Sequence, residues 1–384
     1  MGSFPSPSRP TTPPPSPESN ASSYSNASSY RVLVAFCPKE GGSNTNYFNC
    51  IQCYNPSNNT WSHVSLIPDL LENHVLKGFA MVSLGESIYI VGGRLWNKRK
   101  PQTSSDSGES VNVCVQVSPL VLRYNVRLDQ WSKCATLGVP RYDFACCVCD
   151  KKIYVAGGKS YLDSARGISS AEVYDPALNE WTPLPSMSSL RYKCVGVTWQ
   201  GKIYVMGGFA EREDSDINLL TFSPQRSSAE VFDTRTGGWD LAVGMWQLDV
   251  PPNQIVAVDG KLFSSGDCLK PWKGHIDVYD GKQNMWDEAD GSRFQTLNLP
   301  FSTISGSSNG NWAPIERLYL TMAPIGTQLY FLAGYRVPGE SPRTVSMVYA
   351  FDTSATIGAW KSLEPTEEEG EKELCSHCCV VQFS

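Results

Sequence analysis

The chain has 384 residues, of which 41% are hydrophobic and only 18% are charged, and it contains 31 Gly, 26 Pro and 11 Trp. So many turn formers and aromatic residues with so little charge are typical of a mostly β protein and exclude a long helical architecture. The net charge of −6 argues against nucleic acid or an anionic membrane surface as a partner. No apolar run reaches the roughly 18 residues that span a bilayer.

Residues 1–29 contain seven Pro and ten Ser and almost no large aliphatic side chain. Such a segment cannot bury enough apolar surface to offset the entropy that ordering would cost. We therefore expect a disordered Ser/Pro-rich tail at 1–29 and one folded domain from residue 30 to residue 384.

From residue 30 onward, one pattern repeats, in which a Tyr or Phe precedes a Trp by seven residues. These pairs are Tyr54 and Trp61, Tyr124 and Trp131, Tyr174 and Trp181, Phe232 and Trp239, and Tyr279 and Trp286. A sixth pair, Phe351 and Trp360, is two residues longer. The residues between the aromatics are rich in turn formers, so each pair predicts a hairpin with its two rings opposite each other on antiparallel strands.

Upstream of most hairpins lies an aliphatic strand that ends in two glycines, as in 88–93, 153–158 and 203–208. Paired glycines after a strand indicate positive φ or a close backbone approach. A short apolar strand precedes each of these segments, so one repeat predicts a four-stranded antiparallel sheet. A sheet that is apolar on both faces must stack on neighbouring sheets, and stacking around an axis achieves this.

The paired glycines, the Tyr and the Trp in this order resemble the kelch repeat over residues 31–384. The sequence of residues 171–176 and 181–185 most resembles the kelch repeats of plant F-box/kelch-repeat proteins. The resemblance implies an all-β kelch β-propeller. Ser265 and Ala333 depart from the motif, because each replaces the first of the paired glycines.

The two ends of the chain set the expected number of blades. Residues 31–36 have the pattern of a second strand, and 374–383 have that of a first strand with nothing after it. We therefore expect a six-bladed propeller that is closed by pairing of strand 374–383 with the N-terminal strand 31–36. Closure of this kind removes the open edge that would otherwise invite aggregation.

Motifs for catalysis are missing from the sequence. It has four His, and no G-x-S-x-G, P-loop or dinucleotide-binding motif. We expect a non-enzymatic protein with no catalytic residues, no metal and no cofactor. Glu369, Glu373 and His377 resemble, with Glu in place of Asp, the iron site of plant kelch specifier proteins. This resemblance leaves a small-molecule or metal-assisted activity in the central channel as the alternative.

The sequence contains thirteen Cys, several of them inside apolar runs. We expect buried free thiols in a reducing compartment, which predicts a cytoplasmic or nuclear location. The spacing of Cys50 and Cys53, and of Cys375 and Cys378, leaves a zinc or disulfide staple at the closing blade as an alternative.

The interaction surface is expected at one end of the propeller, where the loops before the inner strands and after the paired glycines gather. Its predicted residues are Lys77, Arg94, Trp96, Arg141, Tyr142, Lys159, Arg191, Tyr192, Phe209, Arg317, Tyr335 and Arg336. Arg and aromatic side chains are over-represented at interface hot spots, and a cationic rim favours an acidic or phosphorylated protein segment as partner. The alternative interpretation is that each Arg braces its neighbouring loop through backbone carbonyls.

The expected function is therefore that of an adaptor or scaffold that binds a protein partner on this face. Members of the resembling plant family act as substrate-recruiting subunits of ubiquitin ligases, which implies a role as substrate receptor in ubiquitin-mediated turnover. We expect no F-box in this chain, because the tail at 1–29 is too short and too polar for a three-helix domain. The sequence does not specify an oligomeric state.

Overall fold

The structure is a computed structural model that describes residues 29–39, 47–98, 112–211, 225–248, 250–268, 274–289, 316–337, 343–355 and 359–383. Within these ranges every regular element is a β-strand, and no helix able to cross a membrane occurs in them. The predicted tail lies outside the described residues except for Ser29, so its disorder stays a prediction.

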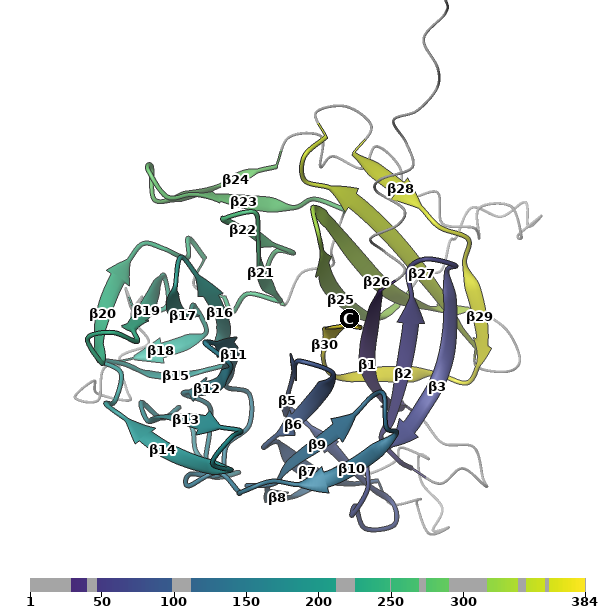
Figure 1. The fold of residues 1–384 in the computed structure, drawn as a ribbon, viewed down its shortest axis with the longest axis horizontal. Helices are drawn as coiled ribbons and strands as arrows, with labels where there is room; N and C mark the ends of the chain where they lie inside the picture. Colours follow the sequence, from purple (N-terminus) through teal and green to yellow (C-terminus); the bar gives the residue numbers. More distant parts are fainter. Residues whose placement is uncertain are drawn as a thin grey trace, which may run out of the picture.

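In the described part of the chain, six sheets of four or five strands surround a common centre (Figure 1). Sheet 1 consists of β3 (Thr60–Leu66), β2 (Cys50–Asn55), β1 (Tyr30–Pro38) and β30 (Lys372–Gln382), and sheet 2 of β10 (Gln130–Lys133), β9 (Val121–Asn125), β6 (Ser87–Val91) and β5 (Ala80–Leu84). Sheet 3 consists of β11 (Ala145–Cys149), β12 (Lys152–Ala156), β13 (Ala171–Asp175) and β14 (Glu180–Leu184), and sheet 4 of β16 (Val195–Trp199), β17 (Lys202–Met206), β19 (Ser228–Asp233) and β20 (Gly238–Val243). Sheet 5 consists of β21 (Ile255–Val258), β22 (Lys261–Ser264), β23 (Asp277–Asp280) and β24 (Met285–Glu288), and sheet 6 of β25 (Arg317–Ile325), β26 (Gln328–Val337), β27 (Arg343–Asp352), β28 (Trp360–Ser362) and β29 (Thr366–Glu369). The all-β propeller fold is thereby confirmed.

The predicted hairpins are present, and each pairs its two aromatic residues across the strands. Tyr174 lies opposite Trp181 in the β13–β14 register, with ring centroids 5.1 Å apart. The Tyr174 hydroxyl donates a hydrogen bond of 2.7 Å to Asn179 in the turn, a residue with φ of 53°. The Trp181 indole donates to the backbone oxygen of Ala135 in the loop that follows sheet 2. The pair therefore shapes its own turn and fastens its sheet to the preceding one.

The paired glycines allow neighbouring sheets to approach closely. Gly157 and Gly158 have φ of 70° and 94°, a region that L side chains rarely adopt. A Cβ on Gly157 would lie 2.7 Å from the backbone oxygen of Arg191, and the Gly158 N–H donates to that same oxygen. The contact joins sheet 3 to the loop that enters sheet 4, so a larger residue would force the two sheets apart.

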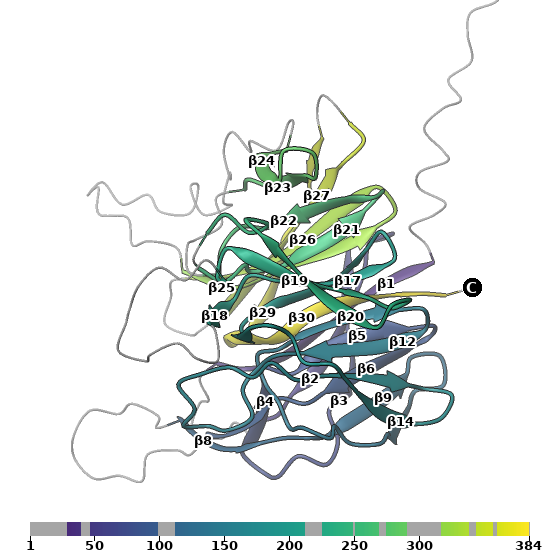
Figure 2. The same cartoon turned by 90° about the vertical axis from the view of Figure 1, so that its left-hand side faces the viewer.

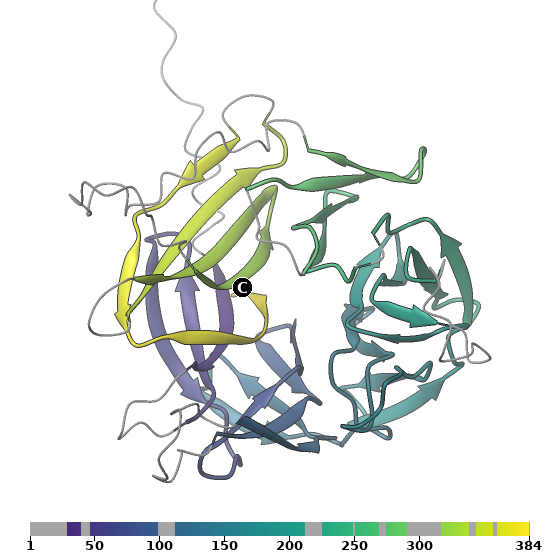
Figure 3. The same ribbon diagram turned by 180° about the vertical axis from the view of Figure 1, so that it is seen from behind.

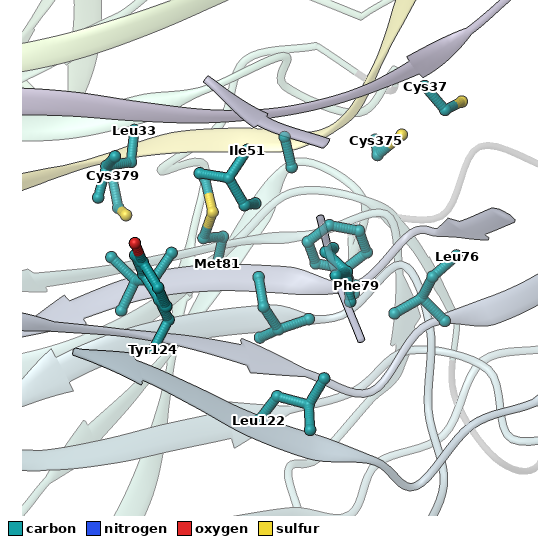
Figure 4. Packing of buried hydrophobic residues seen from close by; sticks show 14 of the residues in the cluster. Leu33, Cys37, Ile51, Leu76, Phe79, Met81, Leu122, Tyr124, Cys375 and Cys379 are labelled. Carbon is teal, nitrogen blue, oxygen red and sulfur yellow. The ribbon is translucent and has the colours of Figure 1, made fainter. Parts of the chain in front are cut away.

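Sheet 1 is assembled from both ends of the described chain. β1 pairs with β30 in an antiparallel register that runs from Tyr30 opposite Gln382 to Pro38 opposite Lys372. Figure 4 shows side chains of this sheet, among them Leu33, Ile51 and Cys379, packed against Met81 of β5 in sheet 2. The segment 374–383 of the sequence prediction corresponds to most of β30, and it pairs with the predicted N-terminal strand.

Lys372, the first residue of β30, is enclosed where sheets 1 and 6 meet. Its ammonium group lies 4.4 Å from the Phe36 ring centroid and 5.7 Å from that of Tyr319. It also donates hydrogen bonds of 2.7 Å to Gln52 and to the Glu368 carboxylate. Burial lowers the pKa of Lys372, and Glu368 opposes that shift.

We expect Lys372→Met to lower the free energy of unfolding by about 3 kcal/mol, because it leaves the Glu368 carboxylate half-buried without its partner. Urea unfolding followed by tryptophan fluorescence measures this change. The control is Lys261→Met at an exposed position of β22, which should change stability by less than about 0.5 kcal/mol. Equal effects of the two substitutions would show that the Lys372 contacts do not secure the closure.

Candidate interaction surface

Two small sheets rise from one end of the propeller. One consists of β4 (His74–Lys77), β7 (Arg94–Lys98) and β8 (Asn112–Val117), and the other of β15 (Leu190–Tyr192) and β18 (Phe209–Glu211). Figure 2 shows β8 and β18 at the same end, away from the chain's C-terminus. Each small sheet pairs the residues just before an inner strand with residues that follow paired glycines, so the two predicted sets of surface residues do come together here.

Arg141 and Arg191 correct the predicted surface, because both side chains are 0% exposed. Arg141 donates hydrogen bonds of 2.9 Å to the backbone oxygens of Gly157 and Ser170, and one of 2.6 Å to Glu172. Arg191 repeats the arrangement one sheet later. These guanidinium groups face inward because backbone oxygens at fixed positions in the fold accept their hydrogen bonds. The alternative interpretation, loop bracing, is correct for these two residues.

Two predicted tyrosines are also largely buried. Tyr142 is 3% exposed and Tyr335 is 5% exposed, so neither offers a free ring to a partner. Burial raises the pKa of both hydroxyl groups. Arg94 stacks on the Tyr142 ring at 4.5 Å, so Tyr142 supports a side chain that does reach the surface.

At the end of sheets 2 to 4 that carries the two small sheets, cations and aromatic rings stack in two short rows. We call the two rows together the cation–aromatic arc, and it consists of Lys77, Trp96, Arg94, Tyr142, Lys159, Tyr192, Phe209 and Arg226. The successive ring contacts measure 5.7 Å (Lys77 to Trp96), 4.9 Å (Arg94 to Trp96), 4.0 Å (Lys159 to Tyr192), 5.1 Å (Tyr192 to Phe209) and 5.7 Å (Arg226 to Phe209). A β-bridge between Tyr142 and Lys159 joins the two halves.

Asp143 lies beneath the centre of the arc. Its carboxylate is 3.9 Å from the Arg94 guanidinium. Burial raises the pKa of Asp143, whereas Arg94, Lys193 and Lys159 lower it. The pKa of Lys159 is lowered by burial and also by repulsion from Arg94 and Lys193, while Asp143 raises it. Among the described residues, three cations thus act on the one carboxylate of Asp143.

The opposite side of the mouth is neutralised by ion pairs. Arg336 contacts both Glu316 and Glu371, at 2.8 and 2.6 Å. Lys77, at the junction of the two sides, lies 2.6 Å from Glu373. Arg317 is half-buried and burial lowers its pKa. Within the described residues, the predicted ring of cations is therefore paired with carboxylates on the side of sheets 6 and 1.

Sequence reasoning missed Asp143, Lys193 and Arg226. Asp143 and Lys193 follow Arg141-Tyr142 and Arg191-Tyr192 at equivalent repeat positions, with φ of 52° and 53°. Their backbones form a chain around the mouth, because Lys193 N–H donates to the Asp143 oxygen and Asp143 N–H to the Gly78 oxygen. The position directly after each Arg-Tyr pair is the sequence signal from which Asp143 and Lys193 could have been predicted. Tyr161, in the loop after Gly158, is 75% exposed and adds an open ring beside the arc.

The residues that resemble an iron site do not converge. Glu373 pairs with Lys77 and Lys98, Glu369 lies opposite Arg343, and His377 lines the central channel. In the described ranges no group of three or more His, Cys, Asp or Glu side chains is placed to hold a metal ion. The structure therefore does not support the metal-dependent alternative.

The fold and this surface define a β-propeller whose loop-bearing end offers aromatic and cationic side chains. The kelch motif matches residues 140–188 and 190–245. The F-box/kelch-repeat protein At1g16250 of Arabidopsis thaliana is 30% identical over 282 residues, which cover 64% of this chain and 70% of that protein. This chain therefore belongs to the kelch-repeat protein family.

Two further relatives carry kelch repeats beside other domains. The F-box/kelch-repeat protein At1g67480 of Arabidopsis thaliana is 32% identical over 53% of this chain and 46% of its own length. Human Kelch repeat and BTB domain-containing protein 12 is 29% identical over 42% of this chain and 25% of its own length. The chain thus spans half or less of these two proteins. Together with the fold, these relatives support a protein-interaction or adaptor role.

The buried Arg141 yields a stability prediction. We expect Arg141→Met to lower the free energy of unfolding by about 4 kcal/mol, because the buried Glu172 carboxylate loses its cationic partner and two backbone oxygens lose a charged donor. Arg127→Met removes an exposed ion pair with Glu86 and should cost less than about 1 kcal/mol. Chemical denaturation compares the two proteins, and a parent-like midpoint for Arg141→Met would contradict the bracing role.

Proposed function

We propose that this chain is a non-enzymatic adaptor that binds an acidic or phosphorylated segment of a protein partner along the cation–aromatic arc. The observation that carries the proposal is a cluster of three cations, Arg94, Lys159 and Lys193, which among the described residues act together on the carboxylate of Asp143. Oppositely charged segments are steered to such a surface and held by charge-assisted hydrogen bonds.

The packing of the arc supports the same proposal. Within the described residues, Trp96 Nε1, Arg94 Nε and Arg226 Nε are buried and have no acceptor, so a partner would contact the outer atoms of these side chains. The stacked rings keep the cationic side chains in place, which lowers the entropy that binding must remove.

The proposed scaffold is a closed ring of six blades, inferred from the six sheets and from the β1–β30 pairing. We further propose that the captured partner is delivered for ubiquitin-mediated turnover, since the similar plant proteins carry an F-box by name. Thirteen free thiols, seven of them buried, fit a reducing location in the cytoplasm or nucleus.

A peptide-binding measurement tests the surface. We expect a fluorescein-labelled peptide of alternating Glu and phosphoserine to bind, and a peptide of the same length with Gln and Ser to bind at least tenfold more weakly. The double variant Arg94→Gln, Lys159→Gln should lose about tenfold in affinity, and added salt should weaken the parent. The control is Lys261→Gln on sheet 5. Equal affinities for both peptides, or an unchanged double variant, would refute the arc as the site.

Affinity purification of the tagged full chain tests the proposed pathway. We expect ubiquitin-ligase subunits to co-purify with the parent and with the arc double variant alike, while the captured substrate is lost only from the variant. Mass spectrometry of the two samples measures both. Purifications in which no ligase subunit exceeds the background of an untagged control would refute the role in turnover but leave the peptide result standing.

A further inference from the structure

The propeller encloses a central cavity of about 750 Å³. Strands β5, β11, β16, β21, β25 and β30 surround it, one from each of the six sheets (Figures 1 and 3). A cavity of this size is within the range that holds a drug-sized molecule. The adaptor function proposed above uses the rim of the mouth and makes no use of this space.

The wall of the cavity is uncharged below the mouth. Its lining includes Lys77, Asp143 and Lys193, which are its only Lys, Arg, Asp or Glu residues within the described part of the chain and which all precede inner strands at one end. The remaining lining is mostly Val, Ala, Met, Pro and Cys side chains. Burial raises the pKa of Cys147 to about 12 and that of Cys194 to about 11, so these thiols stay neutral.

His377 supplies a polar group within this apolar wall. The β1–β30 register shifts twice between Leu33 and Phe36. An advance of three residues along β1 therefore lies opposite an advance of five residues along β30. Bulges of this kind redirect side chains. The Nδ1 atom of His377 is buried and has no hydrogen-bond partner in the described ranges. Burial lowers the pKa of His377 to about 4, so the imidazole is neutral and can accept or donate a hydrogen bond.

Of the two described lysines that line the cavity, one has no carboxylate within ion-pair distance. Lys77 is paired with Glu373, and Asp143 faces Arg94. Lys193 is exposed and forms no salt bridge among the described residues. Its position at the start of an inner strand places its charge over the apolar wall.

We propose that the central cavity binds a small organic acid, with its apolar or aromatic body between the inner strands and its single anionic group at Lys193. Phosphate-rich ligands such as nucleotides fit less well, because one free cation cannot neutralise several phosphate charges. Sugars fit less well because the wall provides few hydrogen-bonding side chains. His377 lines the same cavity, and a hydrogen bond with the Asn253 backbone opposes the lowering of its pKa, so the neutral ring is part of the fixed wall against which the bound molecule packs.

The test uses 8-anilinonaphthalene-1-sulfonate, an aromatic anion whose fluorescence rises when it leaves water. We expect one saturable site per folded chain. Ser376→Phe fills the cavity from β30 and Ser83→Phe fills it from β5, and both serines belong to the lining but to none of the hydrophobic clusters. Each should weaken binding at least tenfold, whereas Ser132→Phe on the exposed strand β10 should leave it unchanged.

A second comparison tests the charge. Lys193→Gln should weaken binding of the sulfonate about fivefold and leave binding of the neutral analogue N-phenyl-1-naphthylamine unchanged. Near-ultraviolet circular dichroism checks that every variant keeps the native fold, and if Ser376→Phe fails this check then Ser83→Phe decides. Parent-like sulfonate binding by a folded cavity-filling variant, or by Lys193→Gln, would overturn the proposal. The acidic peptide serves as a separate probe, because the cavity-filling variants should still bind it.

Discussion

Stacking of sheet on sheet around a closed ring is the constraint on which the rest of the molecule depends. A single four-stranded sheet of this chain is apolar on both faces and cannot remain in water alone. The ring gives every sheet two neighbours, but only when β30 pairs with β1 across more than three hundred residues of sequence. Because that contact joins distant segments, its entropic cost must be met by the cores on both sides of sheet 1, where Lys372 and the Phe36 ring add a buried polar contact.

The same constraint explains why equivalent positions of the repeat differ in role. Arg141 and Arg191 occupy loops where paired glycines bring two sheets together, so backbone oxygens converge on each guanidinium and hold it inside. Arg317 enters sheet 6, where Ala333 replaces a glycine of the pair, and its side chain stays half-buried.

The sequence was sufficient to predict the fold because hairpins and glycine pairs are local and recur. It also grouped Trp96, Lys159 and Phe209 at one end of the propeller, where the structure places them, since each lies within three residues after a glycine pair. It could not separate bracing arginines from surface arginines, because that distinction depends on which backbone oxygens a neighbouring sheet presents. The sequence also could not predict the ion pairs on the other side of the mouth. Glu316, Glu371 and Glu373 come from segments distant in sequence from the lysines and arginines that they pair with.

The uneven charge of the mouth follows from how the ring is closed. Sheets 6 and 1 meet at the seam, and the acidic segment that leads into β30 supplies Glu368, Glu371 and Glu373 to the cations there. Those carboxylates form ion pairs at the closing strand, so their charges and those of the cations there neutralise each other. Among the described residues near sheets 2 to 4, Arg94, Lys159 and Lys193 instead act together on the one carboxylate of Asp143. The seam thereby pairs the cations on its own side of the mouth with carboxylates, which is not the case for Lys159 and Lys193 among the described residues.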